Sequence, residues 1–129
     1  MAVSQRAADD SGAAAVEFAL ILPVLILLLM GLIEFSLLFN TQISLTQAAR
    51  EGARTMAIHN DPAVAQAATI NAAPSVNPVI AAGDIAIAPT DCTAGTTVTV
   101  TINYNAELLT GFFGITLPLE GRGVMLCGG

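Results

Sequence analysis

The sequence contains no lysine and only four arginines, Arg6, Arg50, Arg54 and Arg122, against ten acidic residues, so its formal net charge is −6. Proteins that bind nucleic acids neutralise the phosphates with clustered cations, and four scattered arginines form no such cluster. The same shortage disfavours strong attraction to anionic lipid headgroups. The composition therefore removes nucleic acid from the expected partners.

Residues on which catalytic sites depend are equally scarce. The chain has a single histidine, His59, and two cysteines, Cys92 and Cys127, and their spacing matches no metal-binding motif. Serine and cysteine nucleophiles need a nearby base, and a Walker-type phosphate loop needs a lysine. We therefore expect no enzyme activity, no cofactor, no metal and no small-molecule substrate, and we interpret His59 as an exposed residue at a helix end.

Charged residues make up only 11% of the chain and hydrophobic residues 54%, and the hydrophobic residues concentrate between Ala13 and Phe39. The run FALILPVLILLLMGLI, residues 18–33, carries no charge. With residues 13–16 it gives about 20 residues, the length that a helix needs to cross a bilayer. The sequence therefore predicts one transmembrane helix over residues 13–38.

Three residues in or beside this segment are unusual for lipid. Pro23 removes a backbone donor but is tolerated in membrane helices, and Glu17 and Glu34 lie near the two ends, where a carboxylate costs less than at the bilayer centre. The alternative is a cleaved secretory signal peptide, which has a shorter apolar run followed by a small-residue cleavage site. The sequence EFSLLFNTQ that follows here has no such site. The charges of the two flanks do not decide the orientation.

The apolar run begins at the junction GAAAVEF, in which Gly12 is followed by small or apolar residues, Glu17 and Phe18. This junction resembles the processing site of type IV prepilins. The resemblance implies that a prepilin peptidase cuts between Gly12 and Ala13 on the cytoplasmic side, so that the C-terminal part lies outside. A buried carboxylate without a partner is costly, and the new amine of Ala13 would give Glu17 of a neighbouring subunit its counter-ion. The alternative is a Glu17 that only extends to water at the interface.

Longer motifs sharpen the resemblance. The pieces VEFALILP (residues 16–23), Ile33-Glu34-Phe35 and AAREGAR (residues 48–54) resemble the TadE-like pseudopilins of the tight-adherence (Tad/Flp) pilus system. The resemblance covers roughly the first 45% of the chain, and it is looser beyond. It implies a minor pilin-like protein that acts in pilus assembly or initiation and hence in surface adhesion. By this resemblance, the residues expected to act in assembly are Glu17, Phe18, Pro23 and Glu34. The residues that match the family motif are Arg50, Glu51, Gly52 and Arg54.

The partners that this resemblance implies are a prepilin peptidase, other pilins or pseudopilins, the Tad inner-membrane platform and membrane lipid. The implied location is the cytoplasmic membrane, crossed once, in or at the base of a pilus. A second hypothesis is a membrane-anchored envelope or adhesin domain that does not assemble into a filament. A third, against which Pro23 and the AAREGAR stretch weigh, is a pseudopilin of a different secretion filament.

Beyond the membrane segment, the helical spacing of small and apolar residues predicts that the helix continues to about Ile58. Asp61 and Pro62 are typical of a helix start and predict a second helix over residues 63–73. The small face of the first helix is expected to pack on the exported domain of the same chain; the alternative is close contact with another helix. That small face comprises Ala49, Gly52, Ala53 and Met56.

The last part of the chain is predicted to be β-structured. The run TTVTVTINY, residues 96–104, alternates in the manner of a strand with one buried face, and shorter strands are expected at residues 85–88 and 119–126. Residues 108–117 read as an apolar loop, in which Phe112 and Phe113 are expected to cap the core, the alternatives being contact with the outer leaflet or with a partner. The expected fold class is α+β: a long N-terminal helix followed by a small antiparallel sheet.

The two cysteines lie at the ends of the predicted strands, and in an exported domain an even count favours a disulfide. The alternative is two buried free thiols. Cys92 precedes the strong strand and Cys127 follows the last one, so antiparallel pairing would bring them together. The expected organisation is a cytoplasmic leader (residues 1–12), the transmembrane helix (13–38), a helical stalk with the second helix (39–73) and a small β domain (74–129).

Overall fold

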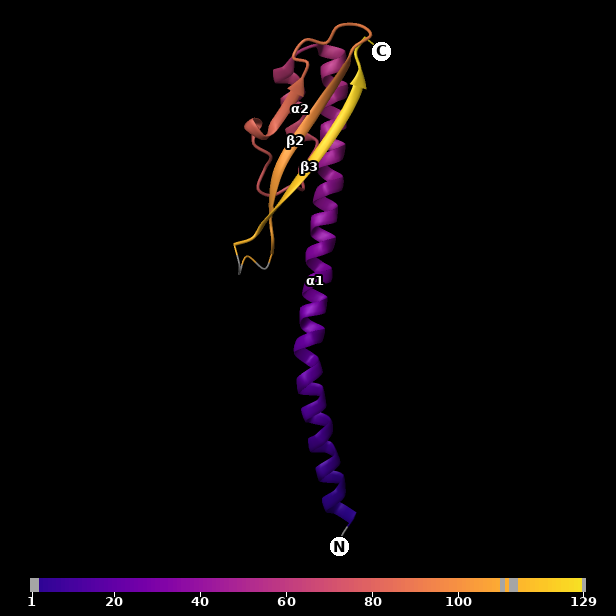
Figure 1. Cartoon of the computed structure of the whole chain (residues 1–129), viewed down its shortest axis with the longest axis vertical. Helices are drawn as coiled ribbons and strands as arrows, with labels where there is room; N and C mark the ends of the chain where they lie inside the picture. Colours follow the sequence, from indigo (N-terminus) through magenta and orange to yellow (C-terminus); the bar gives the residue numbers. More distant parts are fainter. Residues whose placement is uncertain (1–2, 110, 112–113, 129) are drawn as a thin grey trace. The chain divides into compact units, whose positions relative to one another are not determined.

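The computed structural model describes residues 3–109, 111 and 114–128, with side chains described from Ser11 onward. The elements follow in the order α1, α2, a short 3-10 turn, β1, β2 and β3 (Figure 1). The predicted α+β class, with a long apolar helix followed by a short helix and a three-stranded antiparallel sheet, is confirmed. The chain divides into two compact units, Met1–Ser36 and Leu37–Gly129.

Helix α1 covers Val3–His59, which is 57 residues. It therefore begins upstream of the predicted start at Ala13 and runs through the expected leader. Its end agrees with the prediction. Asn60 adopts a left-handed conformation with φ 49°, and its N–H donates to the carbonyl of Met56 at 2.9 Å, which is the common way for a helix to end.

Helix α2 covers Pro62–Asn71, close to the predicted range. The Asp61 carboxylate accepts hydrogen bonds from the N–H groups of Ala63 and Val64 at 2.9 and 3.4 Å. Pro62 occupies the first turn, where its missing N–H costs nothing. The signal that predicted this helix is therefore the one that caps it.

The sheet has the order β1-β2-β3, and both pairings are antiparallel. Strand β1 covers Ile85–Ala88, as predicted, and β2 covers Thr97–Glu107. Strand β3 covers Thr116–Leu126 and so begins three residues before the predicted start. The predicted loop over residues 108–117 is therefore too long, because Leu117 pairs with Ala106 and Thr116 with Glu107 and both continue the ladder. Phe112 and Phe113 lie outside the described residues.

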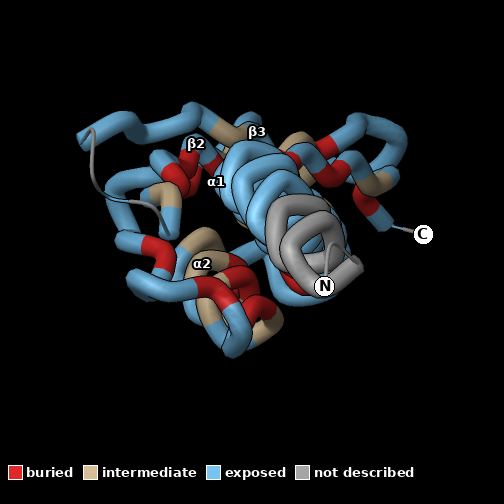
Figure 2. Tube along the Cα trace, turned by 90° about the horizontal axis from the view of Figure 1, so that it is seen from below, coloured by how far each residue is buried: buried red, intermediate tan, exposed pale blue. Residues whose placement is uncertain are grey.

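The alternation along β2 places one face in a core, as predicted. Val98, Val100 and Ile102 are fully buried and Tyr104 nearly so, whereas the threonines and Asn103 between them are exposed or half-buried. Tyr104 donates its hydroxyl hydrogen bond to the carbonyl of Pro78 at 2.9 Å. Figure 2 shows buried positions on α2 and the strands, and exposed positions along the turns of α1 that follow its grey N-terminal residues. The part of α1 that joins this core contributes Leu45, Ala48, Ala49, Ala53 and Met56.

Glycines allow the helix to lie directly on the sheet. A Cβ atom built on Gly121 would lie 2.5 Å from the carbonyl oxygen of Leu45, and one on Gly123 would overlap the carbonyl group of Ala49. A Cβ on Gly52 would overlap the Thr69 hydroxyl of α2. The small face of α1 therefore packs within its own chain, which confirms the expected arrangement.

A disulfide joins Cys92 to Cys127, with 5.5 Å between the two Cα atoms. The predicted pairing is confirmed, and the antiparallel register explains it, because Thr97 lies opposite Leu126 beside the bond. The Asn60 side chain, at the end of α1, binds the segment that contains Cys92. Its amide nitrogen donates to Asp91 Oδ1 at 2.8 Å, and its oxygen accepts from the N–H of Cys92 at 2.6 Å.

Candidate functional site

The candidate site is the N-terminal part of α1. Over residues 11–33 every side chain is exposed except that of Met30, which is half-buried. Large apolar side chains are exposed on all sides, for example Leu20 at 71% and Leu27 at 73%. Among the described residues, one helix is long and apolar enough to cross a membrane, and none of its most apolar stretch is buried. Such a surface requires lipid or other helices around it.

The predicted junction lies at the start of this exposed surface. Gly12, Ala13, Glu17 and Phe18 are all helical and exposed, and a Cβ atom on Gly12 would meet nothing within 4 Å. Ala13 and Glu17 are four residues apart, so they share one face of the helix one turn apart. The glycine therefore has no packing role in this structure, in contrast to Gly52.

Two further predicted residues differ from each other in their surroundings. Pro23 is inside the helix and exposed; it lacks the N–H that would bond to the Ala19 carbonyl. Glu34 is buried, with 8% of its surface exposed, and is one of three buried polar side chains among the described residues together with Thr55 and Thr69. The carboxylates at the two ends of the apolar run thus occupy different environments.

The family motif separates into a packing residue and surface charges. Gly52 is buried against Thr69, which in turn donates its hydroxyl to the Ala65 carbonyl at 2.8 Å. Its charged neighbours lie on the exposed side of α1: Arg50, Glu51 and Arg54. Sequence reasoning did not identify the two glycines of β3 that receive this helix, although the spacing Gly-Arg-Gly on one strand face was a signal for them.

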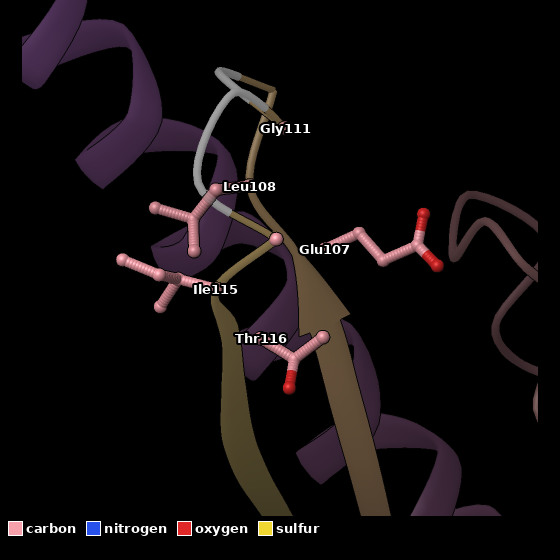
Figure 3. A pocket seen from close by; sticks show the side chains of 6 residues that line it. Glu107, Leu108, Gly111, Ile115 and Thr116 are labelled. Carbon is pink, nitrogen blue, oxygen red and sulfur yellow. The ribbon is translucent and has the colours of Figure 1, made fainter.

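A hollow of about 240 Å³ lies in the β2–β3 loop, lined by Glu107, Leu108, Gly111, Gly114, Ile115 and Thr116 (Figure 3). Glu107 is the only ionisable group in that lining. Within the described residues, no three histidine, cysteine, aspartate or glutamate side chains are grouped to hold a metal ion. His59 is exposed at the end of α1, and its Nδ1 lies 3.2 Å from the Thr55 carbonyl oxygen.

Residues 12–54 match the family model described as TadE-like protein. This segment is TadE-like. The match begins at Gly12 and ends at Arg54, so the TadE-like segment contains both the predicted junction and the AAREGAR motif. The resemblance to the TadE-like family is therefore confirmed.

The TadE-like segment crosses the division between the two units of the structure. It includes the exposed apolar part of α1 and the part of α1 that packs on the sheet. The strands themselves follow the matched residues in the sequence. The TadE-like family implies an association with Tad pili, and one helix of the described residues is long and apolar enough to cross a membrane once. Searches of curated proteins and of solved structures find no match.

Proposed function

We propose that the chain is a minor pseudopilin of a Tad/Flp pilus, processed by a prepilin peptidase after Gly12 and acting in pilus assembly or initiation. The observation that supports this proposal is the exposed apolar surface of residues 18–33 within the TadE-like segment, with the exposed carboxylate of Glu17 at its start. An anchor needs only length and hydrophobicity. A carboxylate placed on the apolar surface needs a partner once water is excluded.

Cleavage would supply that partner. The new Ala13 amine carries a positive charge, and Glu17 of a neighbouring subunit would pair with it when two helices pack side by side. The same amine lies one turn from Glu17 of its own chain, so an unassembled subunit can satisfy the pair internally. Assembly would then exchange an internal pair for one between subunits, and the membrane part would be organised as a leader (residues 1–12) and a span (13–38).

The junction is helical in this chain, because α1 begins at Val3. A peptidase cuts extended backbone, so the helix must open around Gly12 before it is cut. Glycine lowers the cost of that opening by about 1 kcal/mol relative to alanine. This role fits a glycine around which a Cβ atom would meet nothing.

The processing claim is tested by co-expression with the matching prepilin peptidase and N-terminal sequencing of the product. The expected mature chain begins at Ala13, with the C-terminal domain on the external side of the membrane. Gly12→Phe should block cleavage, whereas Gly31→Phe, at an equally open glycine of the same helix, should not. An uncleaved chain of 13.2 kDa that persists with the active peptidase would contradict the proposal and favour the anchored envelope or adhesin domain.

The pairing claim is tested with the neutral substitution Glu17→Gln. We expect normal cleavage and a fall in assembled pili of at least about tenfold, which corresponds to roughly 1.4 kcal/mol. Glu51→Gln is the matched control, since Glu51 is also exposed on α1 but lies outside the apolar segment. Equal pilus yields for both variants and the wild type would rule out the pairing.

A further inference from the structure

Apolar side chains continue beyond the core at the closed end of the β2–β3 hairpin. Ala106 and Leu117 pair on the buried side of the sheet, and by alternation Leu108 and Ile115 follow on that same side. Figure 3 shows the Leu108 and Ile115 side chains extending to one side of the hairpin and Glu107 to the other. The core does not cover this end, because Ile115 is 59% and Leu117 41% exposed. Leu109, beside them, is 67% exposed.

Contacts within the unit Leu37–Gly129 show at which end of it this hairpin closes. Gln42 Nε2 donates to the Glu120 carbonyl at 2.7 Å, and further along both elements Gly123 lies against Ala49. Helix α1 and strand β3 therefore run in the same direction. Residues before Glu120 accordingly lie toward the end at which α1 enters the unit, at Leu37.

That end is also where the chain leaves the bilayer. The apolar run ends near Leu38, and the first residues of the unit carry further exposed apolar side chains, Leu37 at 42% and Phe39 at 59%. The hairpin end and the helix entry thus form one apolar end of the unit Leu37–Gly129, at the point in the sequence where the apolar run ends. A soluble surface has no reason to gather exposed leucine and isoleucine there.

We propose that the closed end of the hairpin, formed by Leu108, Leu109, Ile115 and Leu117, inserts into the lipid bilayer surface beside the point where α1 emerges. The contact is apolar rather than electrostatic. Residues 107–119 contain one acid, Glu107, and no basic residue, and Glu107 extends away from the apolar side. The insertion therefore requires no anionic lipid.

Such a contact gives the membrane two points of attachment to the domain. A single helix leaves the domain free to rotate and tilt above the bilayer. A second contact fixes the orientation of the sheet relative to the membrane surface. Extraction of the subunit into a filament would remove the hairpin from lipid. The contact therefore belongs to the membrane-resident state of the protein.

The test uses the full chain with its native disulfide, reconstituted in phosphatidylcholine vesicles. Ile115→Cys is labelled with an environment-sensitive fluorophore, and Ile58→Cys is the matched control. Ile58 has the same side chain and a similar exposed fraction, 62%, but lies roughly 30 Å further along α1 from Leu37. The two native cysteines are bonded to each other, so only the introduced thiol is labelled.

We expect blue-shifted emission at position 115 and quenching by headgroup-region spin-labelled lipid several-fold stronger than at position 58. Partial replacement of phosphatidylcholine by phosphatidylserine should leave both unchanged. Leu109→Cys should behave like Ile115→Cys, which guards against a local folding defect at one site. Equal quenching at positions 109, 115 and 58 would overturn the proposal, as would protection at 115 that appears only with other pilus subunits, which would assign the hairpin to a protein partner. None of these outcomes depends on cleavage after Gly12.

Discussion

One helix serves two regions of this molecule, and its surface changes between them. In the unit Met1–Ser36 the helix presents large aliphatic side chains on all sides, and nearly all of those described are exposed. In the unit Leu37–Gly129 its buried face is made largely of small residues, such as Ala48, Ala49 and Gly52. The size of the side chains follows from what surrounds them.

Large side chains suit a helix whose neighbours are lipid tails or other helices, since hydrophobic transfer requires area but no particular fit. Small side chains suit a helix that must lie on a sheet at backbone distance. The first region is therefore expected to depend on its partners and the second on its internal contacts. Substitutions that separate these two dependencies test the comparison.

Removal of the disulfide should give the largest effect and confine it to the second region. The bond closes a loop of 35 residues, and loss of that closure is worth about 4 kcal/mol in the chain-entropy model. In the double variant Cys92→Ala/Cys127→Ala we expect rapid amide exchange throughout β2 and β3, measured by hydrogen–deuterium exchange in detergent micelles. Exchange over residues 18–33 should stay slow. Chemical reduction of the wild type is the control and should reproduce the pattern; equal loss of protection in both regions would contradict the comparison.

A methyl group added to a glycine should give the next largest difference. Gly123→Ala places a Cβ against the Ala49 carbonyl and should destabilise the second region by about 3 kcal/mol, because the helix must move off the sheet. Gly31→Ala, where a Cβ meets nothing within 4 Å, should leave stability unchanged or slightly raised. Thermal unfolding of the two purified variants measures both. The comparison fails if the two substitutions have the same effect.

Much of the fold was predictable because its strongest signals are local. The uncharged run of residues 18–33, the Asp61-Pro62 helix start and the alternation of residues 96–104 each depend on neighbouring residues alone, and each element is found where it was predicted. The disulfide was also predictable, because the two cysteines lie at the ends of strands that were expected to pair. These features required no knowledge of tertiary contacts.

The misplaced boundaries have a tertiary cause. The last strand was predicted to begin at Leu119, after an apolar loop, but β3 begins at Thr116 and includes Pro118. Because β3 is an edge strand of the described sheet, the missing N–H of Pro118 is tolerated there. The start of α1 at Val3 was also missed, because the predicted segment began with the apolar run at Ala13, whereas the helix extends into the polar residues before it. The pairing of Gly121 and Gly123 with the α1 backbone depends on residues some 75 positions apart, which periodicity does not reveal.

For the candidate site, the sequence could name the residues but not their surroundings. Glu17 and Glu34 were both expected near the ends of the span, yet Glu17 is exposed and Glu34 is buried. Likewise, Gly52 and Arg50 belong to one motif but serve packing and surface, respectively. Burial depends on what the rest of the chain brings to a helix face, so spacing alone could not assign these roles.

The smallest predicted effect concerns Tyr104, which titrates in the second region only. Burial, and then the nearby Glu107 carboxylate, raise the pKa of its phenol, so the folded state holds this proton more tightly than the unfolded chain does. The stability that the neutral hydroxyl contributes is complete below about pH 10, the unfolded value, and is lost as pH rises through the folded pKa. The chain has no lysine, no other tyrosine and no free cysteine, so this alkaline range contains no competing side-chain titration of those kinds.

Tyr104→Phe should lower the free energy of unfolding by about 1 kcal/mol at pH 7, through the lost hydrogen bond to the Pro78 carbonyl, and should flatten the fall in melting temperature between about pH 9 and 12. Parallel curves for the variant and the wild type would show that another group governs alkaline unfolding.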